Sequence, residues 1–160
     1  MTKAARLVIL DRDGVINFDS DEFIRTPTEW IPIPGSLEGI ALLTRHGFTV
    51  TVATNQSGIG RRLYDRQALA AIHRKMRLAV SRAGGSVDRI AYCPHRPGAG
   101  CECRKPAIGL LVELARHYAV PLAGVPVIGD TERDLEAARV AGARPVLVLT
   151  GNGRRTRERL

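Results

Sequence analysis

Short apolar runs alternate with helical patterns along this chain, and this alternation limits the possible folds more than any other feature. The apolar runs contain few polar residues, as strands of a parallel sheet covered on both faces require. They are residues 7–10, 48–53, 90–92, 125–128 and 146–149. Strand–helix alternation of this kind predicts an α/β fold, with a single doubly wound (Rossmann-like) parallel sheet and helices on both faces.

The expected helices have recognisable ends. Ser36 is a candidate N-cap for a helix that runs to His46 and closes at Gly47. Asp65 is a candidate N-cap for a longer helix that closes at Gly84. Two more helices are expected over about residues 108–118 and 132–141. His46, His73 and His117 fall within these helical patterns, and we interpret them as surface or packing residues.

Length and charge restrict the class of protein. The 160 residues suit one domain, residues 1–160, and the 44% hydrophobic and 25% charged content excludes disorder and coiled coil. No apolar run is long enough to cross a membrane, and the one before Asp11 is too short for a signal peptide. We therefore expect a cytoplasmic protein with no membrane partner.

The net charge of +8 favours anionic partners such as phosphate esters. Aromatic residues make up only 4% of the chain, which leaves little for stacking on bases, so we expect no nucleic-acid partner. Part of the charge lies in a basic tail, residues 152–160, which we expect to be solvated and frayed. Two segments without periodicity, residues 17–34 and 93–106, are predicted to be functional loops.

Polar clusters follow three of the expected strands: Asp11-Arg12-Asp13-Gly14, Thr54-Asn55-Gln56-Ser57-Gly58 and Gly129-Asp130-Thr131-Glu132-Arg133-Asp134. The carboxyl ends of parallel strands meet at one edge of a sheet, so these clusters are expected to converge there. Carboxylates of Asp11 and Asp130 offer the oxygen ligands that Mg²⁺ prefers. One carboxylate can attack phosphorus while Asp13, two residues on, acts as general acid and base. Thr54 and Lys105 can stabilise the transferring phosphoryl oxygens.

All three cysteines of the chain lie close together with a histidine among them: Cys93, His95, Cys101 and Cys103. A set of three thiols and one imidazole supplies the four ligands of a closed structural Zn²⁺ site. The sequence therefore predicts a zinc loop over residues 93–103. Because Cys103 directly precedes Arg104 and Lys105, the zinc would fix where these two cations point.

Four segments carry a family resemblance: residues 11–17, 54–59, 103–106 and 129–130. They resemble the four motifs of the haloacid dehalogenase superfamily of phosphatases. Within it, the zinc loop is similar to that of the D-glycero-D-manno-heptose-1,7-bisphosphate 7-phosphatase family, with histidinol-phosphate phosphatases as the next relatives. The stretches between Asp13 and Thr54 and between Asn55 and Arg104 are too short for an extra domain, so we expect a single domain without a cap.

The resemblance implies roles for individual residues. Asp11 would be the nucleophile and Asp13 the general acid/base, with Thr54 and Lys105 steadying the phosphoryl group. Asp11, Asp130 and the Asp13 backbone carbonyl would bind the catalytic Mg²⁺, beside a structural Zn²⁺. The candidate substrate-binding residues are Arg12, Asp19, Ser20, Asp21, Glu22, Asn55, Gln56, Ser57, Arg104 and Thr131.

The implied reaction is hydrolysis of the 7-phosphate of the heptose bisphosphate through an aspartyl-phosphate, on the route to ADP-heptose for lipopolysaccharide cores. The expected partner is a small phosphorylated sugar, and the expected state is a monomer. Three alternatives stay open. The acidic loop residues Asp19, Asp21 and Glu22 would suit histidinol phosphate, the basic tail would suit nucleic-acid ends, and the chain could be a zinc-stabilised binding module without activity.

Overall fold

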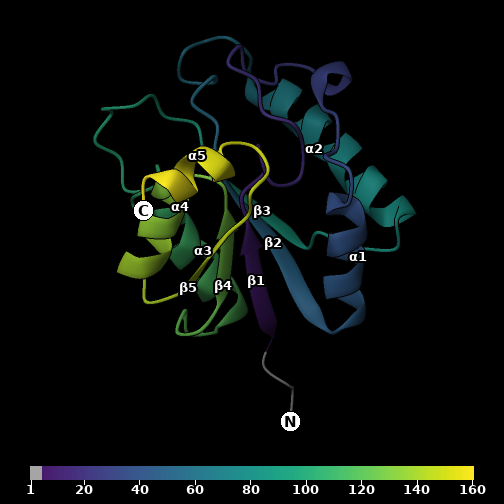
Figure 1. The fold of residues 1–160 in the computed structure, drawn as a ribbon. Helices are drawn as coiled ribbons and strands as arrows, with labels where there is room; N and C mark the ends of the chain where they lie inside the picture. The colour runs from purple at the N-terminus through teal and green to yellow at the C-terminus, as the bar shows by residue number, and fades with distance from the viewer. Residues whose placement is uncertain (1–4) are drawn as a thin grey trace.

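The computed structural model describes residues 5–160, and its centre is one five-stranded parallel sheet (Figure 1). The strands lie in the order β3-β2-β1-β4-β5, and every neighbouring pair is parallel. Their bounds are β1 (Arg6–Leu10), β2 (Phe48–Asn55), β3 (Arg89–Cys93), β4 (Pro126–Gly129) and β5 (Arg144–Leu147). The predicted doubly wound α/β architecture is confirmed.

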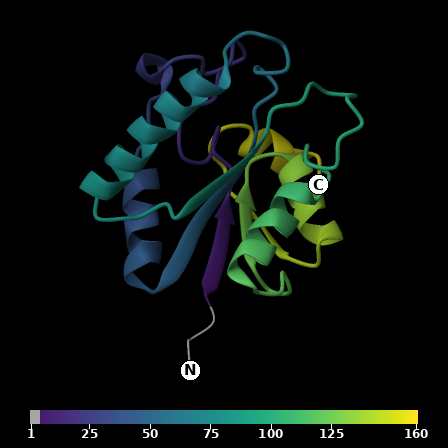
Figure 2. The ribbon, with the colours of Figure 1, turned by 180° about the vertical axis from the view of Figure 1, so that it is seen from behind.

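Helices cover both faces of the sheet. They are α1 (Ser36–Arg45), α2 (Arg66–Arg82), α3 (Gly109–Tyr118) and α4 (Glu132–Val140), with two short elements, η1 (Pro27–Glu29) and α5 (Gly153–Glu158). Figures 1 and 2 show α1 and α2 on one side of the sheet and α3 and α4 on the other. Successive residues of β1 point to opposite faces: Val8 joins the core with Met76 of α2, and Ile9 joins the core with Leu111 of α3. Burial on both faces explains why the strands read as continuous apolar runs.

The helix ends agree with the sequence at α2 and differ at α1. The Asp65 carboxylate accepts a hydrogen bond from the Ala68 backbone N–H at 2.8 Å, as expected of an N-cap. The prediction for Ser36 is wrong. Ser36 is the first residue of α1, the N-cap is Gly35 with a φ of 89°, and the Ser36 hydroxyl donates to the Val15 carbonyl at 2.7 Å. The Ser36 hydroxyl therefore bonds to a carbonyl that is distant in the sequence and does not cap the helix, as the local sequence had suggested.

The last strand lies earlier than predicted. β5 covers Arg144–Leu147 where the apolar run suggested residues 146–149. Arg144 pairs with Pro126 at the start of β4, so the strand begins where the pairing begins and not where the residues become apolar. The apolar run correctly indicated a strand in this region, but the bounds of β5 follow from its pairing with β4.

The C-terminal tail also differs from expectation. It forms α5 instead of fraying: Gly153 and Thr156 are buried while Arg154, Arg155, Arg157 and Arg159 are exposed. The Thr156 hydroxyl donates to the Asp130 carbonyl at 2.7 Å. Gly153 and Thr156, three residues apart, share the buried face of the helix and lie against Val148 and Asp130, and the arginines are exposed.

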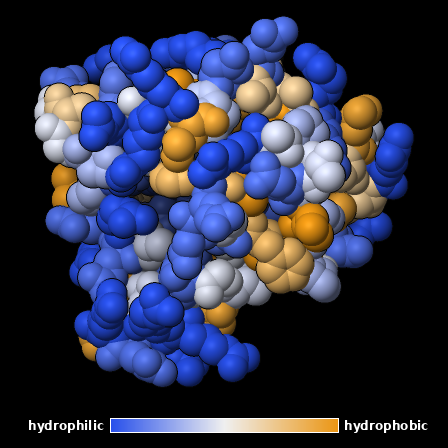
Figure 3. Space-filling model, turned by 90° about the horizontal axis from the view of Figure 1, so that it is seen from above, coloured by the Kyte–Doolittle hydropathy of each residue, from blue (hydrophilic) through white to orange (hydrophobic). Residues whose placement is uncertain are grey.

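The sheet order places a crevice at the carboxyl end of the central strand. The chain runs from β1 outward through β2 and β3, then returns to the other side of β1 for β4 and β5. Ligands bind α/β sheets at such a switch in strand order. Figure 3 looks onto this end of the molecule, where hydrophilic side chains predominate. Within residues 5–160, no helix combines the length and the apolar character needed to cross a bilayer.

Candidate active site

Three carboxylates converge where β1 and β4 end. Asp11 directly follows β1, and its backbone N–H donates to the Ile128 carbonyl of β4 at 2.9 Å. The side chains of Asp11, Asp130 and Asp134 offer oxygen atoms that all lie within 4.8 Å of one another. Burial and then the Asp134 carboxylate raise the pKa of Asp11 well above its ordinary value, although Lys105 opposes them. This crowding of hard oxygen ligands, more negative than one lysine can neutralise, fits a divalent cation such as Mg²⁺.

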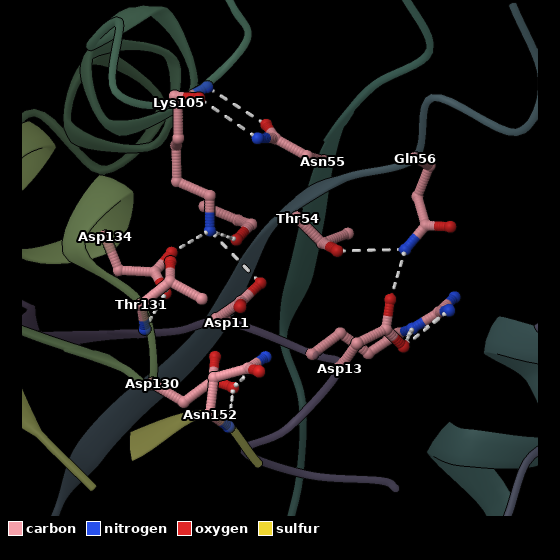
Figure 4. A network of polar contacts seen from close by, with 12 residues as sticks. Asp11, Asp13, Thr54, Asn55, Gln56, Lys105, Asp130, Thr131, Asp134 and Asn152 are labelled. Carbon is pink, nitrogen blue, oxygen red and sulfur yellow. Dashed lines mark hydrogen bonds and ion pairs between the residues drawn. The ribbon is translucent and has the colours of Figure 1, made fainter. Parts of the chain in front are cut away.

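Lys105 reaches into this cluster from the loop that follows the cysteines (Figure 4). Its Nζ donates to Asp134 Oδ1 and the Ala53 carbonyl at 2.7 Å and to Asp11 Oδ1 at 3.1 Å. Burial by itself lowers the pKa of Lys105, but the carboxylates of Asp11 and Asp134 outweigh it and raise the pKa above its ordinary value. Lys105 is therefore a fixed positive charge beside the Asp11 carboxylate.

The backbone around Lys105 is held by β2. Asn55 Oδ1 accepts from the Lys105 backbone N–H at 3.0 Å, and Asn55 Nδ2 donates to the Lys105 carbonyl at 3.1 Å. Figure 4 shows the two bonds side by side. The Asn55 amide thus ties the Lys105 segment to the end of β2.

Asp130 is held from the C-terminal side of the chain. Its Oδ2 accepts from the Asn152 backbone N–H at 2.8 Å and from Asn152 Nδ2 at 3.3 Å. The backbone of Gly14 passes the same oxygen so closely that a Cβ at this position would lie 2.1 Å from Asp130 Oδ2. Gly14 also has a φ of 85°, which favours glycine, so backbone conformation and space both require it.

Asp13 has a separate set of partners. Its Oδ1 accepts from Arg12 Nε at 2.9 Å, from Arg12 Nη2 at 2.8 Å and from Asn17 Nδ2 at 2.9 Å. Its Oδ2 accepts from Gln56 Nε2 at 3.2 Å, and the same Gln56 amide donates to Thr54 Oγ1 at 2.9 Å. Arg12 is completely buried. It lies behind Asp13 and supports that carboxylate.

A cavity of about 270 Å³ joins these groups. Twelve of the fifteen residues predicted for catalysis, substrate binding or Mg²⁺ line it: Asp11, Asp13, Asp19, Ser20, Asp21, Asn55, Gln56, Ser57, Arg104, Lys105, Asp130 and Thr131. Three do not. Arg12 is covered by Asp13, Thr54 is buried and bonded to Gln56, and the exposed Glu22 lies outside the lining. The substrate-binding roles of Arg12 and Glu22 and the phosphoryl-stabilising role of Thr54 stay predictions, because these residues lie outside the cavity lining.

The lining also contains residues that sequence reasoning did not assign: Phe23, Ile24, Arg61, Arg133, Asp134 and Asn152. Asp134 stands four residues after Asp130 and could have been found as the third carboxylate of the same polar cluster. Arg133 lies in the same polar cluster as Asp130, and Arg61 follows soon after the polar cluster at the end of β2, but neither was assigned a role. Asn152 had no signal in the sequence, because only the folding of the C-terminal segment brings it to the cavity.

Three arginines give one side of the cavity a positive charge. Arg61, Arg104 and Arg133 line it, and within residues 5–160 none of them forms an ion pair. Burial and then Arg133 lower the pKa of Arg104, to which Arg61 contributes in the same direction. The cavity therefore combines an acidic centre, suited to a cation, with a basic side suited to an anion.

The cysteine–histidine set forms a compact cluster. Cys93 Sγ lies 2.9 Å from Cys103 Sγ and 3.7 Å from Cys101 Sγ, and His95 Nδ1 lies 3.1 Å from Cys103 Sγ. All four ligand atoms lie within 4.8 Å of one another, and the thiols are free. The Arg104 backbone N–H lowers the pKa of Cys101 to about 6, whereas burial raises the pKa of Cys93 and of Cys103. The donor types and their spacing fit a tetrahedral Zn²⁺.

Comparisons with known proteins agree with this geometry. A family model described as HAD-hydrolase-like matches residues 102–160. The chain is 55% identical over 154 residues to a D-glycero-beta-D-manno-heptose-1,7-bisphosphate 7-phosphatase of Pseudomonas putida, covering 96% of this chain and 88% of that protein. A protein of the same name from Bordetella bronchiseptica is 57% identical over 151 residues, covering 94% and 84%.

Solved structures show the same similarity. The crystal structure of D,D-heptose 1,7-bisphosphate phosphatase from B. bronchiseptica, complexed with magnesium and phosphate, has a TM-score of 0.95 at 55% identity, covering 97% of this chain and 87% of that chain. The corresponding enzyme of Burkholderia thailandensis has a TM-score of 0.75 at 42% identity, covering 97% and 85%. The chain belongs to the D-glycero-beta-D-manno-heptose-1,7-bisphosphate 7-phosphatase family of HAD-like hydrolases.

Proposed function

We propose that this protein is a Mg²⁺-dependent phosphatase that removes the 7-phosphate from D-glycero-β-D-manno-heptose 1,7-bisphosphate, the substrate in the names of its relatives. The observation that carries the proposal is a single cavity that holds both a carboxylate cluster beside Lys105 and three arginines that form no ion pair among the described residues 5–160. The first group suits phosphoryl transfer, and the second suits a phosphate that does not react. By the resemblance to its family, the product serves ADP-heptose synthesis for the lipopolysaccharide core.

Asp11 is the nucleophile in the proposed reaction. One of its carboxylate oxygens forms a bond to phosphorus as the ester P–O bond breaks, and Asp13 gives its proton to the departing sugar oxygen. Asp13 then takes a proton from a water molecule whose oxygen attacks the aspartyl-phosphate, which releases phosphate and restores Asp11. Lys105 stabilises negative charge on the transferring oxygens. Asp11, Asp130 and the Asp13 carbonyl would hold Mg²⁺, which neutralises charge on the phosphoryl group when bound.

The cavity lining suggests how the rest of the substrate is bound. Arg61, Arg104 and Arg133 would bind the second phosphate, because guanidinium groups match phosphate oxygens in charge and geometry. Asp19, Ser20, Asp21 and Ser57 offer acceptors and hydroxyls for the sugar. The carboxylates of Asp19 and Asp21 in the lining are also what a cationic end would need, so histidinol phosphate remains the second candidate substrate.

Phosphate release by the purified protein tests the proposal. We expect a higher kcat/KM on the β-anomer of the heptose bisphosphate than on the α-anomer or histidinol phosphate, and no turnover by Asp11→Asn. Arg133→Gln should raise KM for the bisphosphate about tenfold through loss of a charged contact to phosphate. The exposed Arg139→Gln on the same helix is the matched control. Equal kcat/KM on histidinol phosphate would refute the substrate preference, and full activity of Asp11→Asn would refute the enzymatic proposal.

We further propose that Cys93, His95, Cys101 and Cys103 bind a structural Zn²⁺ that positions Arg104 and Lys105. In support, Cys93 ends β3 and pairs in register with Asn55, whose amide holds the Lys105 backbone. The Zn²⁺ would thus hold the segment 103–105 at Cys103, and Asn55 holds it at Lys105.

The proposal extends to a single capless domain over residues 1–160 that is active as a monomer in the cytoplasm. Light scattering of the active protein tests the oligomeric state.

A further inference from the structure

The two carboxylate oxygens of Asp13 are unequally supplied with hydrogen-bond donors. Oδ1 accepts from two nitrogens of Arg12 and from Asn17 Nδ2, all at 2.8–2.9 Å. Oδ2 has one longer bond, from Gln56 Nε2 at 3.2 Å. A proton on Oδ1 would face three N–H donors. Oδ2 is therefore the oxygen that can carry and transfer a proton.

Arg12 is fixed in turn by a residue far away in the sequence. Its Nη1 lies 3.2 Å from Nε2 of His73, which is 61 residues later in the middle of α2. The Arg12 side chain is completely buried, and Asp13 is its one ion-pair partner within residues 5–160. Asp13 accepts from Nε and Nη2 of Arg12, and His73 therefore accepts from the remaining nitrogen, Nη1.

His73 is suited to this acceptor role. It is 8% exposed, and its ring packs edge-on against Tyr92, with the ring centroids 6.5 Å apart. Burial and then the Arg12 charge lower the pKa of His73 to about 3. The neutral ring keeps Nε2 free to accept from Arg12 near neutral pH.

We propose that His73 and Arg12 are positioning residues for Asp13: His73 holds Arg12, and Arg12 clamps Oδ1 of Asp13 so that Oδ2 is presented for proton transfer. This inference rests on the proposed function of Asp13 as general acid and base. It gives α2, which contributes no residue to the cavity lining, a part in the catalytic step.

The dependence of kcat on the leaving group distinguishes a misplaced Asp13 carboxyl from a general loss of folded protein. A sugar alkoxide needs a proton as it departs, so its rate depends on a well-placed acid. A p-nitrophenolate ion leaves readily without one. Misplacing the Asp13 carboxyl should therefore slow hydrolysis of the sugar phosphate far more than hydrolysis of p-nitrophenyl phosphate.

The experiment compares kcat and KM of His73→Leu, His73→Gln and the exposed control His46→Gln on heptose bisphosphate and p-nitrophenyl phosphate. Gln retains an acceptor oxygen near the position of Nε2, and Leu does not. We expect His73→Leu to lower kcat on the sugar phosphate about tenfold with little change in KM, and to lower kcat on the aryl phosphate less than about threefold. His73→Gln should recover most of the loss, and Asp13→Asn should show the same substrate contrast more strongly.

Two results would overturn the inference: equal losses on both substrates, or full activity of His73→Leu. If circular dichroism shows that His73→Leu is unfolded, Arg12→Lys replaces it, because one amine cannot reproduce the paired bonds to Oδ1, and the same contrast is required. Failure of the proposed function is a different result. In that case the wild-type protein would not hydrolyse the heptose bisphosphate. The contrast between alkyl and aryl phosphates would then be measured with another sugar phosphate that the protein does hydrolyse.

Discussion

Gly14 lies where the first site loop passes against the carboxylate of Asp130, and it illustrates how one residue type can be required twice. Its φ of 85° favours glycine, and a Cβ would meet Asp130 Oδ2 at 2.1 Å. Gly35 has a similar φ of 89° but open space around it. Alanine substitutions at Gly14 and Gly35 therefore distinguish the effect of backbone strain, common to both, from displacement of the Asp130 carboxylate, which occurs only at Gly14.

We expect Gly35→Ala to lower the free energy of unfolding by roughly 1–2 kcal/mol, the cost of a left-handed conformation for an L-residue, and Gly14→Ala to lower it further because its Cβ also displaces Asp130. Only Gly14→Ala should also weaken Mg²⁺ binding, because Asp130 must move. Urea unfolding and calorimetric titration with Mg²⁺ measure the two effects. Equal Mg²⁺ affinity in both variants would contradict this account of Gly14.

His73 predicts a pH dependence of stability. The chief charged groups near it are Arg12, Asp13 and Arg77, and its pKa falls from 6.5 to about 3 on folding, chiefly through burial. Below about pH 6.5 the unfolded chain therefore binds a proton that the folded protein does not, so the contribution of His73 becomes more destabilising as pH falls.

The wild-type protein should thus lose stability relative to His73→Gln by on the order of 1.4 kcal/mol per pH unit as the pH falls from about 6 to about 4. Urea unfolding of both proteins at a series of pH values measures the difference. Parallel curves over this range would show that His73 titrates normally in the folded state.

At the scale of elements, α5 is part of the site although the sequence suggested a frayed tail. Thr156 donates to the Asp130 carbonyl at 2.7 Å, and Asn152, just before the helix, binds the Asp130 carboxylate. The helix therefore supports the main chain and the side chain of a proposed Mg²⁺ ligand.

Thr156→Val keeps the shape of the side chain and removes its hydroxyl, so the buried Asp130 carbonyl loses a donor. We expect the free energy of unfolding to fall by about 1–2 kcal/mol. The exposed Arg157→Ala in the same helix should change it by less than about 0.5 kcal/mol. Thermal unfolding of the two variants compares them, and equal midpoints would show that α5 is not anchored through Thr156.

The zinc loop is the second element whose role can be isolated. Cys103→Ser should lose zinc and lower kcat/KM, because the following Arg104 and Lys105 would no longer be held in place. Zinc content by atomic absorption and phosphate release are the two measurements, with Ala99→Ser, an exposed residue of the same loop, as the control. A variant without zinc but with wild-type kcat/KM would refute the positioning role.

At the scale of the whole molecule, the net charge of +8 and the arginine side of the cavity attract anions. We expect kcat/KM to fall as ionic strength rises, because the screening length shrinks from about 10 Å at 0.1 M to about 3 Å at 1 M. The fall should be steeper for the heptose bisphosphate than for p-nitrophenyl phosphate, which carries less charge. Rates measured in increasing NaCl check this, and equal slopes would argue against long-range attraction of the second phosphate.

Local patterns in the sequence were sufficient for the α/β class, for most of the cavity residues and for the cysteine cluster. Apolar runs report burial on both faces of a sheet, and polar clusters at strand ends report the edge where ligands bind. They were insufficient where a side chain takes a distant partner. Ser36 gives its hydroxyl to Val15, Arg12 turns from the cavity to Asp13 and His73, and Thr156 docks on Asp130.

The sequence by itself determined the order of strands and helices and the chemical groups that meet at the ends of β1, β2 and β4, because periodicity and residue type are local properties. Only the tertiary structure decided which charges are paired and which remain free to bind a ligand. Asp134 forms an ion pair with Lys105, and the buried Arg12 forms one with Asp13. Arg61, Arg104 and Arg133 line one cavity. The reason is physical: pairing and burial depend on distances between residues that are far apart in the chain, and those distances exist only once the sheet has formed.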